Sequence, residues 1–152
     1  MDKNTALEIF RNRHSVREYL DKEVKDDDIE TILEAGKLAP VGLNRDVRRF
    51  IVLKKGEPLR ELLDSYYDRD VFYSAPVVIC VFVKNEAVDV RLDGAASMEN
   101  MLLCASMLGL GGCWIHAPYK HFTRAHNLED QAKFGFDENY TCVGSIIVGY
   151  EK

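Results

Sequence analysis

The sequence predicts an α+β fold built as one domain over residues 1–152. Apolar runs of strand length, of which residues 76–83 are the clearest, alternate with segments whose apolar residues recur at helical spacing, as in residues 26–40 and 90–108. Hydrophobic residues make up 47% of the 152 positions, enough for a core that folds without disulfides or a metal. No internal repeat, low-complexity segment or long linker marks a second domain.

The first third of the chain contains two expected helices and one expected strand. An amphipathic segment predicts a short helix over residues 4–11. Residues 26–28 are all aspartates, which supply an N-cap and negative charge at the positive end of a second helix, and Pro40 ends that helix. Gly36 suggests close packing against another element. Residues 49–53 are rich in strand-forming side chains and predict a strand.

The middle of the chain alternates helix and strand. Pro58 suits the first turn of a helix that runs to about Tyr67. Residues 76–83 are apolar without alternation, so we expect a strand covered on both faces. Residues 90–108 are apolar almost all round, which predicts a helix buried in the core or at a subunit interface.

The last part of the chain predicts two strands around a helix. A strand begins at Cys113, and residues 123–133 form a short polar helix. Residues 142–150 form the last strand, in which Gly144 and Gly149 suggest bulges or a close backbone neighbour.

The composition excludes several classes of partner. A net charge of −5 argues against a general nucleic-acid or anionic-membrane surface. The N-terminus mixes charges of both signs, unlike a signal peptide, and no apolar run is long enough to cross a bilayer. We therefore expect a cytoplasmic protein whose partner is a small molecule, with no nucleic-acid partner and no membrane partner.

The cysteines and histidines do not predict a metal site. The four cysteines are scattered without a C-x-x-C pair, so reduced thiols are the default. The histidines lack the i, i+4 spacing of a zinc motif. Cys113, His116 and His121 form the one cluster that merits inspection.

The glycine-rich segment 109–112 does not fit a dinucleotide-binding turn. That motif needs a strand before it and a helix after it, so that phosphate meets the positive end of the helix. Here the expected helix comes first. Gly109 is therefore interpreted as a helix stop in the left-handed conformation. The other glycines indicate a tight turn, or a close approach of the backbone to a flat ligand.

Residues 13–17, Arg-His-Ser-Val-Arg, form a short cationic cluster that suits a phosphate. Arginine presents a planar fork of N–H donors that matches phosphate oxygens, and Ser15 adds a neutral donor. The alternative is a solvated surface loop, because short basic runs usually face water. Ser15 has little support as a nucleophile, since neither a serine-centred elbow nor a base partner is evident.

Separated segments of the chain resemble the FMN-dependent nitroreductase family in order and spacing. They are residues 13–19, residues 38–45 leading into 49–52, and residues 109–115. The resemblance extends from about residue 8 to residue 150. It implies a nitroreductase-like fold, in which helices flank a central, mostly antiparallel sheet. It also implies bound FMN and an interwoven homodimer with a long buried interface helix.

The resemblance assigns roles to the basic cluster. Arg13 and Ser15 correspond to the phosphate and ribityl contacts, and His14 to a neighbour that contributes main-chain atoms. Arg17 corresponds to the cation near the flavin N1 and O2 edge, where a positive charge favours reduction of the flavin.

Two further segments correspond to contacts with the flavin. The loop that reaches the flavin from the second subunit is matched by Pro40, Val41, Gly42 and Asn44. The backbone that lies against the ring near N5 is matched by Trp114, Ile115, His116 and Ala117.

The chain departs from the family pattern at several positions. Where the family loop continues with Gln-Pro-Trp, this chain has Asp46-Val47-Arg48, which exchanges an aromatic residue for a cation and puts the substrate preference in doubt. The family tends to place a cation after its last strand, and here Lys152 could substitute for it. Shorter segments at 69–74 and 85–89 predict a more open flavin face.

The implied function is hydride transfer from NAD(P)H through flavin N5 to an electron-poor acceptor such as a nitroaromatic compound or a quinone, in two half-reactions. The flavin supplies the reactivity, so no side chain is predicted to act as acid, base or nucleophile. The main alternative is a degenerate flavin-binding module with little turnover. A weaker one is an anion-binding interaction protein that uses only residues 13–17.

Overall fold

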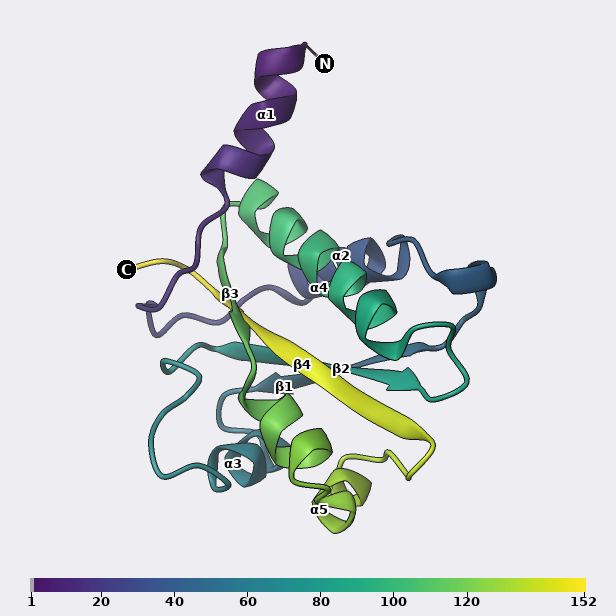
Figure 1. The fold of residues 1–152 in the computed structure, drawn as a ribbon. Helices are drawn as coiled ribbons and strands as arrows, with labels where there is room; N and C mark the ends of the chain where they lie inside the picture. Colours follow the sequence, from purple (N-terminus) through teal and green to yellow (C-terminus); the bar gives the residue numbers. More distant parts are fainter. Residues whose placement is uncertain (1) are drawn as a thin grey trace.

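A four-stranded antiparallel sheet organises the chain, with the strand order β1-β2-β4-β3. A computed structural model, which describes residues 2–152, shows this sheet with helices on both of its faces (Figure 1). The strands are β1 (Arg48–Lys54), β2 (Val77–Lys84), β3 (Gly111–Ile115) and β4 (Tyr140–Gly149). The predicted α+β class with a mostly antiparallel sheet is confirmed.

The helices form two layers around this sheet. On one face lie α2 (Asp26–Lys37) and α4 (Val90–Met107), and on the other lie α3 (Pro58–Asp64) and α5 (Leu128–Lys133) (Figure 1). A 3-10 turn at Gly42–Asn44 and a π-helical turn at Tyr119–Arg124 complete the order. The first helix, α1 (Lys3–Asn12), projects beyond the body of the molecule at the end of α4 (Figure 1).

Strand β2 separates the two hydrophobic cores. Its side chains alternate, so that Ile79 and Val81 belong to the core beneath α4, whereas Cys80 and Phe82 belong to the core beneath α3. All residues from Val77 to Val83 are buried. The expectation that this strand is covered on both faces is therefore confirmed.

Glycines allow α4 to approach its neighbours closely. A Cβ atom on Gly36 of α2 would lie 2.9 Å from Cγ of Met101 on α4. A Cβ atom on Gly94 of α4 would lie 2.7 Å from Cγ2 of Val143 on β4. The close packing expected at Gly36 is confirmed, and Gly94 has the same role against the sheet.

The glycines of β4 also match their predicted roles. The pairing of β2 with β4 shifts register between Val81 and Phe82, opposite Gly144. A Cβ atom on Gly149 would lie 2.6 Å from Cδ of Pro76. Gly144 thus marks the irregularity, and Gly149 marks a close neighbour.

The segment after α1 lies along the sheet edge. Ser15 forms a parallel bridge with Gly112, and the Val16 amide donates to the Gly112 carbonyl oxygen at 3.0 Å. Further on, the Leu20 amide donates to the Tyr150 carbonyl oxygen at 2.9 Å. The basic cluster therefore lies beside both β3 and the end of β4.

Three predicted details were wrong. Helix α2 begins with Lys25 as its N-cap and without a side-chain cap bond, so the aspartates occupy its first turn instead. Helix α3 ends at Asp64 rather than near Tyr67. The helix expected over residues 123–133 is divided into the π-helical turn and α5, because His126 between them has a φ of 56°.

The remaining expectations concern membranes, thiols and metals. Among the described residues no helix is long and apolar enough to span a bilayer. Cys80, Cys104, Cys113 and Cys142 are free and buried, as expected for reduced thiols in a core. Residues 2–152 contain no group of three or more metal-ligating side chains, so the cluster around His116 is not assembled.

Candidate functional site

A cavity of about 590 Å³ lies beside β3 and the turn that follows it. β3 is the edge strand of the sheet, and only its N-terminal part is covered by residues 15–16. The cavity brings Arg17 together with Trp114, Ile115, His116 and Ala117, all of which the sequence indicated. Its other lining residues are Tyr66, Tyr67, Arg69, Asp70, Val71, Tyr73, Cys113, Lys120 and His121.

The basic cluster borders a smaller hollow of about 200 Å³. Arg13 and His14 line it together with Gly111 and Gly112. A Cβ atom on Gly111 would lie 2.8 Å from Cγ2 of Val16, and one on Gly112 would lie 2.9 Å from Cδ2 of Leu102. Protein side chains therefore occupy the space that a Cβ atom would need at each of these glycines.

The C-terminus lies beside the basic cluster. Nε2 of His14 lies 2.9 Å from Oε1 of Glu151, and its Nδ1 lies 3.0 Å from the Asn12 carbonyl oxygen. The hydrogen bond to Glu151 is the largest cause that raises the pKa of His14 above its ordinary value. The Lys152 amide donates to the Glu18 carbonyl oxygen at 3.1 Å, so the last residue is held at this place.

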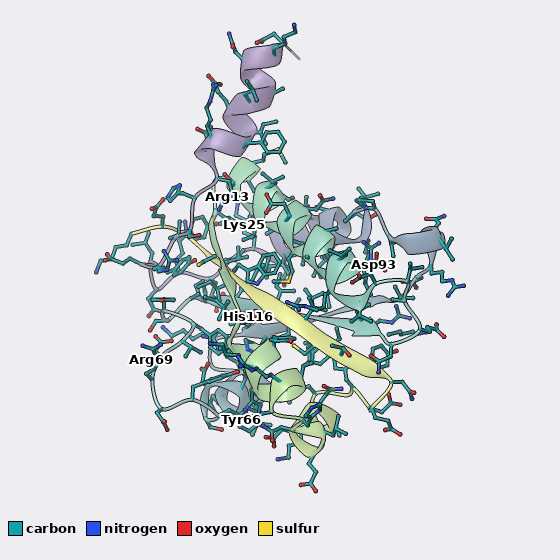
Figure 2. The ribbon with its side chains drawn as sticks, in the orientation of Figure 1. Arg13, Lys25, Tyr66, Arg69, Asp93 and His116 are labelled. Atoms are coloured by element: carbon teal, nitrogen blue, oxygen red, sulfur yellow. The ribbon has the colours of Figure 1, made fainter. Side chains whose placement is uncertain are left out.

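The loop 40–44 lies elsewhere in the same chain. Its Gly42 amide donates to Oδ1 of Asp93 at 3.0 Å, near the N-terminal end of α4. Figure 2 shows Asp93 well separated from Arg13, which lies near the opposite end of that helix. The structure therefore does not bring Pro40, Val41, Gly42 and Asn44 together with the other predicted site residues.

The conformation of this loop is unusual. Leu43 and Asn44 have φ angles of 53° and 52°, in a region that non-glycine residues rarely adopt. Leu43 is also 74% exposed. Backbone strain of this kind persists only where neighbouring contacts hold it, and it is frequent at binding sites.

Arg48 helps to hold the loop. Its Nη1 donates to the Ala39 carbonyl oxygen and to Oγ of Ser97, both at 2.9 Å, and its Nη2 donates to the Lys37 carbonyl oxygen at 2.9 Å. The guanidinium therefore caps the last turn of α2 and links it to α4. Arg48 therefore stabilises the fold of a single chain, and it does not line the cavity beside β3.

Replacing Arg48 by Met is expected to lower the free energy of unfolding by about 2 kcal/mol, because carbonyl oxygens and a hydroxyl lose a charged donor. Chemical denaturation at a fixed protein concentration measures the effect. Arg49→Met is the matched control. Arg49 is half-buried and pairs with the exposed Asp46 at 3.1 Å, and its Nη1 donates to the carbonyl oxygen of the adjacent Arg48 without linking separate elements, so its loss is expected to change stability by less than about 1 kcal/mol. Equal losses in the two variants would contradict the structural role of Arg48.

Aromatic side chains form one wall of the cavity beside β3. The Tyr66 ring stacks on His121 with a centroid distance of 4.3 Å, and Nε2 of His121 lies 2.8 Å from Oδ2 of Asp130. His116 stacks on Tyr119 at 4.6 Å. Figure 2 shows His116 near the middle of the molecule, with Tyr66 below it and Arg69 to one side.

Cations surround the same cavity. Burial is the main cause that lowers the pKa of His116, and the charges of Lys120, Arg91 and Arg124 lower it further. The sequence interpretation missed Tyr66, Arg69 and Lys120 as lining residues, and it considered His121 only as a metal ligand. No local motif marked these residues, since their common property is their position in space after the chain has folded.

A larger hollow of about 820 Å³ lies near the start of α2, at some distance from β3. Its charges largely satisfy one another, because Lys54 pairs with Asp26 and Lys55 pairs with Asp21. The cavity beside β3 contains the residues that the motifs indicated, and it is therefore the candidate site.

Fold and cavity together define an antiparallel α+β protein with a cavity lined by several cations at the edge of its sheet. The model of the nitroreductase family matches residues 10–69 and 65–150, so the chain belongs to that family.

Known proteins are similar over nearly the whole chain. A protein of Archaeoglobus fulgidus, whose name provisionally assigns it NADH dehydrogenase/NAD(P)H nitroreductase activity, is 31% identical over 97% of this chain and 86% of its own length. A Bacteroides fragilis nitroreductase structure with bound FMN has a TM-score of 0.84 and 26% identity, and the match covers 100% of this chain and 90% of that one. An FMN-dependent nitroreductase from Clostridium difficile has a TM-score of 0.81 and 26% identity, with coverages of 96% and 87%.

Proposed function

We propose that residues 1–152 act as a flavin-binding domain that uses FMN to transfer electrons from NAD(P)H to a small electron-poor acceptor. The observation that carries this proposal is the cavity at the edge of β3, where a cation, a strand edge and an aromatic wall meet. Family membership and the FMN in the Bacteroides fragilis relative support it. A cytoplasmic location is part of the same proposal.

The residues present fit an FMN molecule. The edge of β3 beyond Gly112 and the turn after it offer main-chain groups to a flat polar ring, and Arg17 adds a positive charge. The neighbouring hollow offers the guanidinium of Arg13 to an anion, whereas the His14 ring is paired with Glu151 at the same hollow and leaves only main-chain atoms for this role. The ring of FMN can therefore bind at the edge of β3, and its phosphate can bind at the smaller hollow.

In this proposal, the residues of the chain bind and orient FMN. Arg13 and Ser15 hold the phosphate and ribityl groups, with His14 contributing main-chain atoms and Lys152 a second cation. The backbone from Trp114 to Ala117 orients the ring, and Arg17 stabilises negative charge that develops at its N1 and O2 edge. FMN supplies hydride acceptance at N5, and NAD(P)H and the acceptor use the site in turn.

A homodimer completes the proposed site. The loop of Pro40, Val41, Gly42 and Asn44 is held by Asp93 at the end of α4 remote from Arg13. A second subunit that packs against α4 would bring its own loop to this cavity. The outward face of α4 is suited to this role, because Leu92 and Met107 are 67% and 59% exposed.

The decisive experiment uses the purified protein. We expect a yellow protein that releases FMN on heating and that oxidises NAD(P)H faster when a quinone or nitroarene is added. Initial rates at several fixed acceptor concentrations should give the parallel double-reciprocal lines of a ping-pong mechanism. If FMN binds but no acceptor increases NAD(P)H oxidation, the chain is instead a flavin-binding module with little turnover. A colourless protein that FMN cannot reconstitute would contradict both interpretations.

Replacing Arg13 by Ala is expected to weaken FMN binding by at least about 1.5 kcal/mol, roughly tenfold in the dissociation constant, because a charge-assisted contact to phosphate is lost. Titration of the FMN-free protein with FMN, followed by flavin fluorescence, measures the change. Arg11→Ala is the matched control, since Arg11 lies in the exposed last turn of α1. An unchanged affinity for FMN in the Arg13 variant would show that the basic cluster does not bind the phosphate.

A further inference from the structure

We propose that Arg69 and Lys120 recognise an anionic group, a carboxylate, sulfonate or phosphate, on a reactant that enters the cavity beside β3. This inference rests on the proposed function, because it names the chemical class of a substrate for the same site. Arg69 precedes the turn at residues 70–74, and Lys120 belongs to the π-helical turn, so two separate elements supply the charges.

The first observation is an imbalance of charge. The whole chain carries a net charge of −5, yet Arg17, Arg69 and Lys120 all line this one cavity. Within residues 2–152, none of them forms an ion pair or a side-chain hydrogen bond, although many other lysines and arginines do. Three cations beside a single carboxylate leave a positive local charge, and a bound anion lowers the electrostatic energy of that arrangement.

The carboxylate of Asp70, which also lines the cavity, offsets one of these three positive charges and leaves the other two. Oδ1 of Asp70 accepts the Phe72 amide at 3.0 Å, and its Oδ2 accepts the Ser74 hydroxyl at 2.8 Å. Asp70 therefore organises its own turn, in which Tyr73 and Ser74 both have φ angles of 53°. A turn tied in this way holds Arg69 beside the cavity.

His116 lies among further cations. His116 has a lowered pKa, caused first by burial and then by Lys120, Arg91 and Arg124. Each of these neighbours is a cation, so the space near His116 has a positive potential. Nε2 of His121 lies 2.8 Å from Oδ2 of Asp130, a carboxylate that is not among the lining residues of the cavity.

The anion is distinct from the phosphate of FMN. Arg13 and His14 border the smaller hollow, which Arg69 and Lys120 do not line. Tyr66 stacked on His121 and the 41% exposed Tyr73 provide aromatic surface beside the unpaired cations. Aromatic surface next to cations suits a flat reactant that carries a negative substituent.

The test uses the FMN-loaded protein and matched pairs of reactants. A neutral naphthoquinone is compared with its sulfonated analogue as acceptor, and NADH is compared with NADPH as donor. The variants are Arg69→Gln, Lys120→Gln and both together. Lys37→Gln is the control, because that lysine lies on α2 with an exposed side chain. Comparing ratios between wild type and variant removes the intrinsic reactivity of each compound.

We expect the double variant to lower the kcat/KM ratio of sulfonated to neutral acceptor about tenfold, with a smaller effect in each single variant. Higher ionic strength should reduce the preference of the wild type in the same direction. If the NADPH to NADH ratio falls instead, the recognised group is a phosphate of the dinucleotide. The proposal is overturned if neither ratio changes, or if Lys37→Gln changes them equally.

Calorimetry separates this proposal from the proposed function. Binding of 2-naphthalenesulfonate, which is not reduced, is compared with binding of the neutral 2-naphthalenemethanol in wild type and in the double variant. Selective loss of sulfonate binding supports the anion site whether or not the protein retains FMN. Equal binding of both compounds in both proteins overturns it. Failure to bind FMN, by contrast, overturns the proposed function alone.

Discussion

Replacing Leu92 and Met107 together by Glu is expected to convert the protein into a folded monomer that no longer retains FMN. Both side chains point outward from α4, with exposures of 67% and 59%. Burying a large apolar side chain contributes about 1.5–3 kcal/mol, and a two-fold interface contains each residue twice. Charges at these positions would raise the dissociation constant of the dimer at least a thousandfold, corresponding to about 4 kcal/mol.

The reason for expecting FMN to be lost with the dimer is the position of the loop 40–44. One chain holds this loop near Asp93, away from its own Arg13 (Figure 2). Sedimentation velocity gives the oligomeric state, visible absorbance gives the FMN content, and circular dichroism verifies that the variant is folded. A monomer with full FMN occupancy would contradict the shared site.

A matched variant controls for added surface charge. Leu128→Glu places one such charge on α5, where Leu128 is 48% exposed on the opposite side of the sheet from α4 (Figure 1). We expect this variant to remain dimeric and yellow. A dimer that persists with both Leu92 and Met107 replaced would place the interface on another surface.

Replacing Gly94 by Leu is expected to lower the free energy of unfolding by about 3 kcal/mol. A Cβ atom at this position would lie 2.7 Å from Cγ2 and 2.9 Å from Cβ of Val143, a stiff β-branched residue on the central strand β4. Overpacking of this kind typically destabilises a protein by 1–3 kcal/mol and sometimes by more. The gain in helix propensity over glycine, about 0.8 kcal/mol, offsets only part of the loss.

Denaturant unfolding at one protein concentration measures this loss, since the homodimer that we propose would make stability depend on concentration. Gly109→Ala is the control. Its added Cβ meets nothing within 4 Å, and only its φ of +76° opposes the change, so about 1 kcal/mol is expected. A Gly94→Leu variant as stable as the control would show that α4 does not pack as closely on β4.

The order of the elements could be predicted because each depends on local patterns. The unbroken apolar run of β2 indicated burial on both faces, and the left-handed Gly109 ended α4 as expected. Where competing local signals were present, the prediction failed. Asp26 looked like a cap yet lies within the first turn of α2, and His126 interrupts a polar segment that looked continuous.

The candidate site could be predicted only where a motif marked it. Arg17 and residues 114–117 were recognised from their segments, and they do share one cavity. Arg48 illustrates the limit. In the sequence, Arg48 departs from the pattern of the family loop, which put the substrate preference in doubt. In the structure, its guanidinium donates to the carbonyl oxygens of Lys37 and Ala39 and so completes the end of α2.

The periodicity of apolar residues and the placement of glycines predict the α+β fold and its two-sided central strand, and the resemblance to the family marks the motif segments of the site. These features depend on side chains close together along the chain. The field around the cavity depends instead on Arg69 and Lys120, which lie far apart in the sequence and meet only when their turns pack beside β3. Coulomb interactions act through space, so this gathering of unpaired cations, which we propose selects an anionic reactant, was decided by tertiary structure alone.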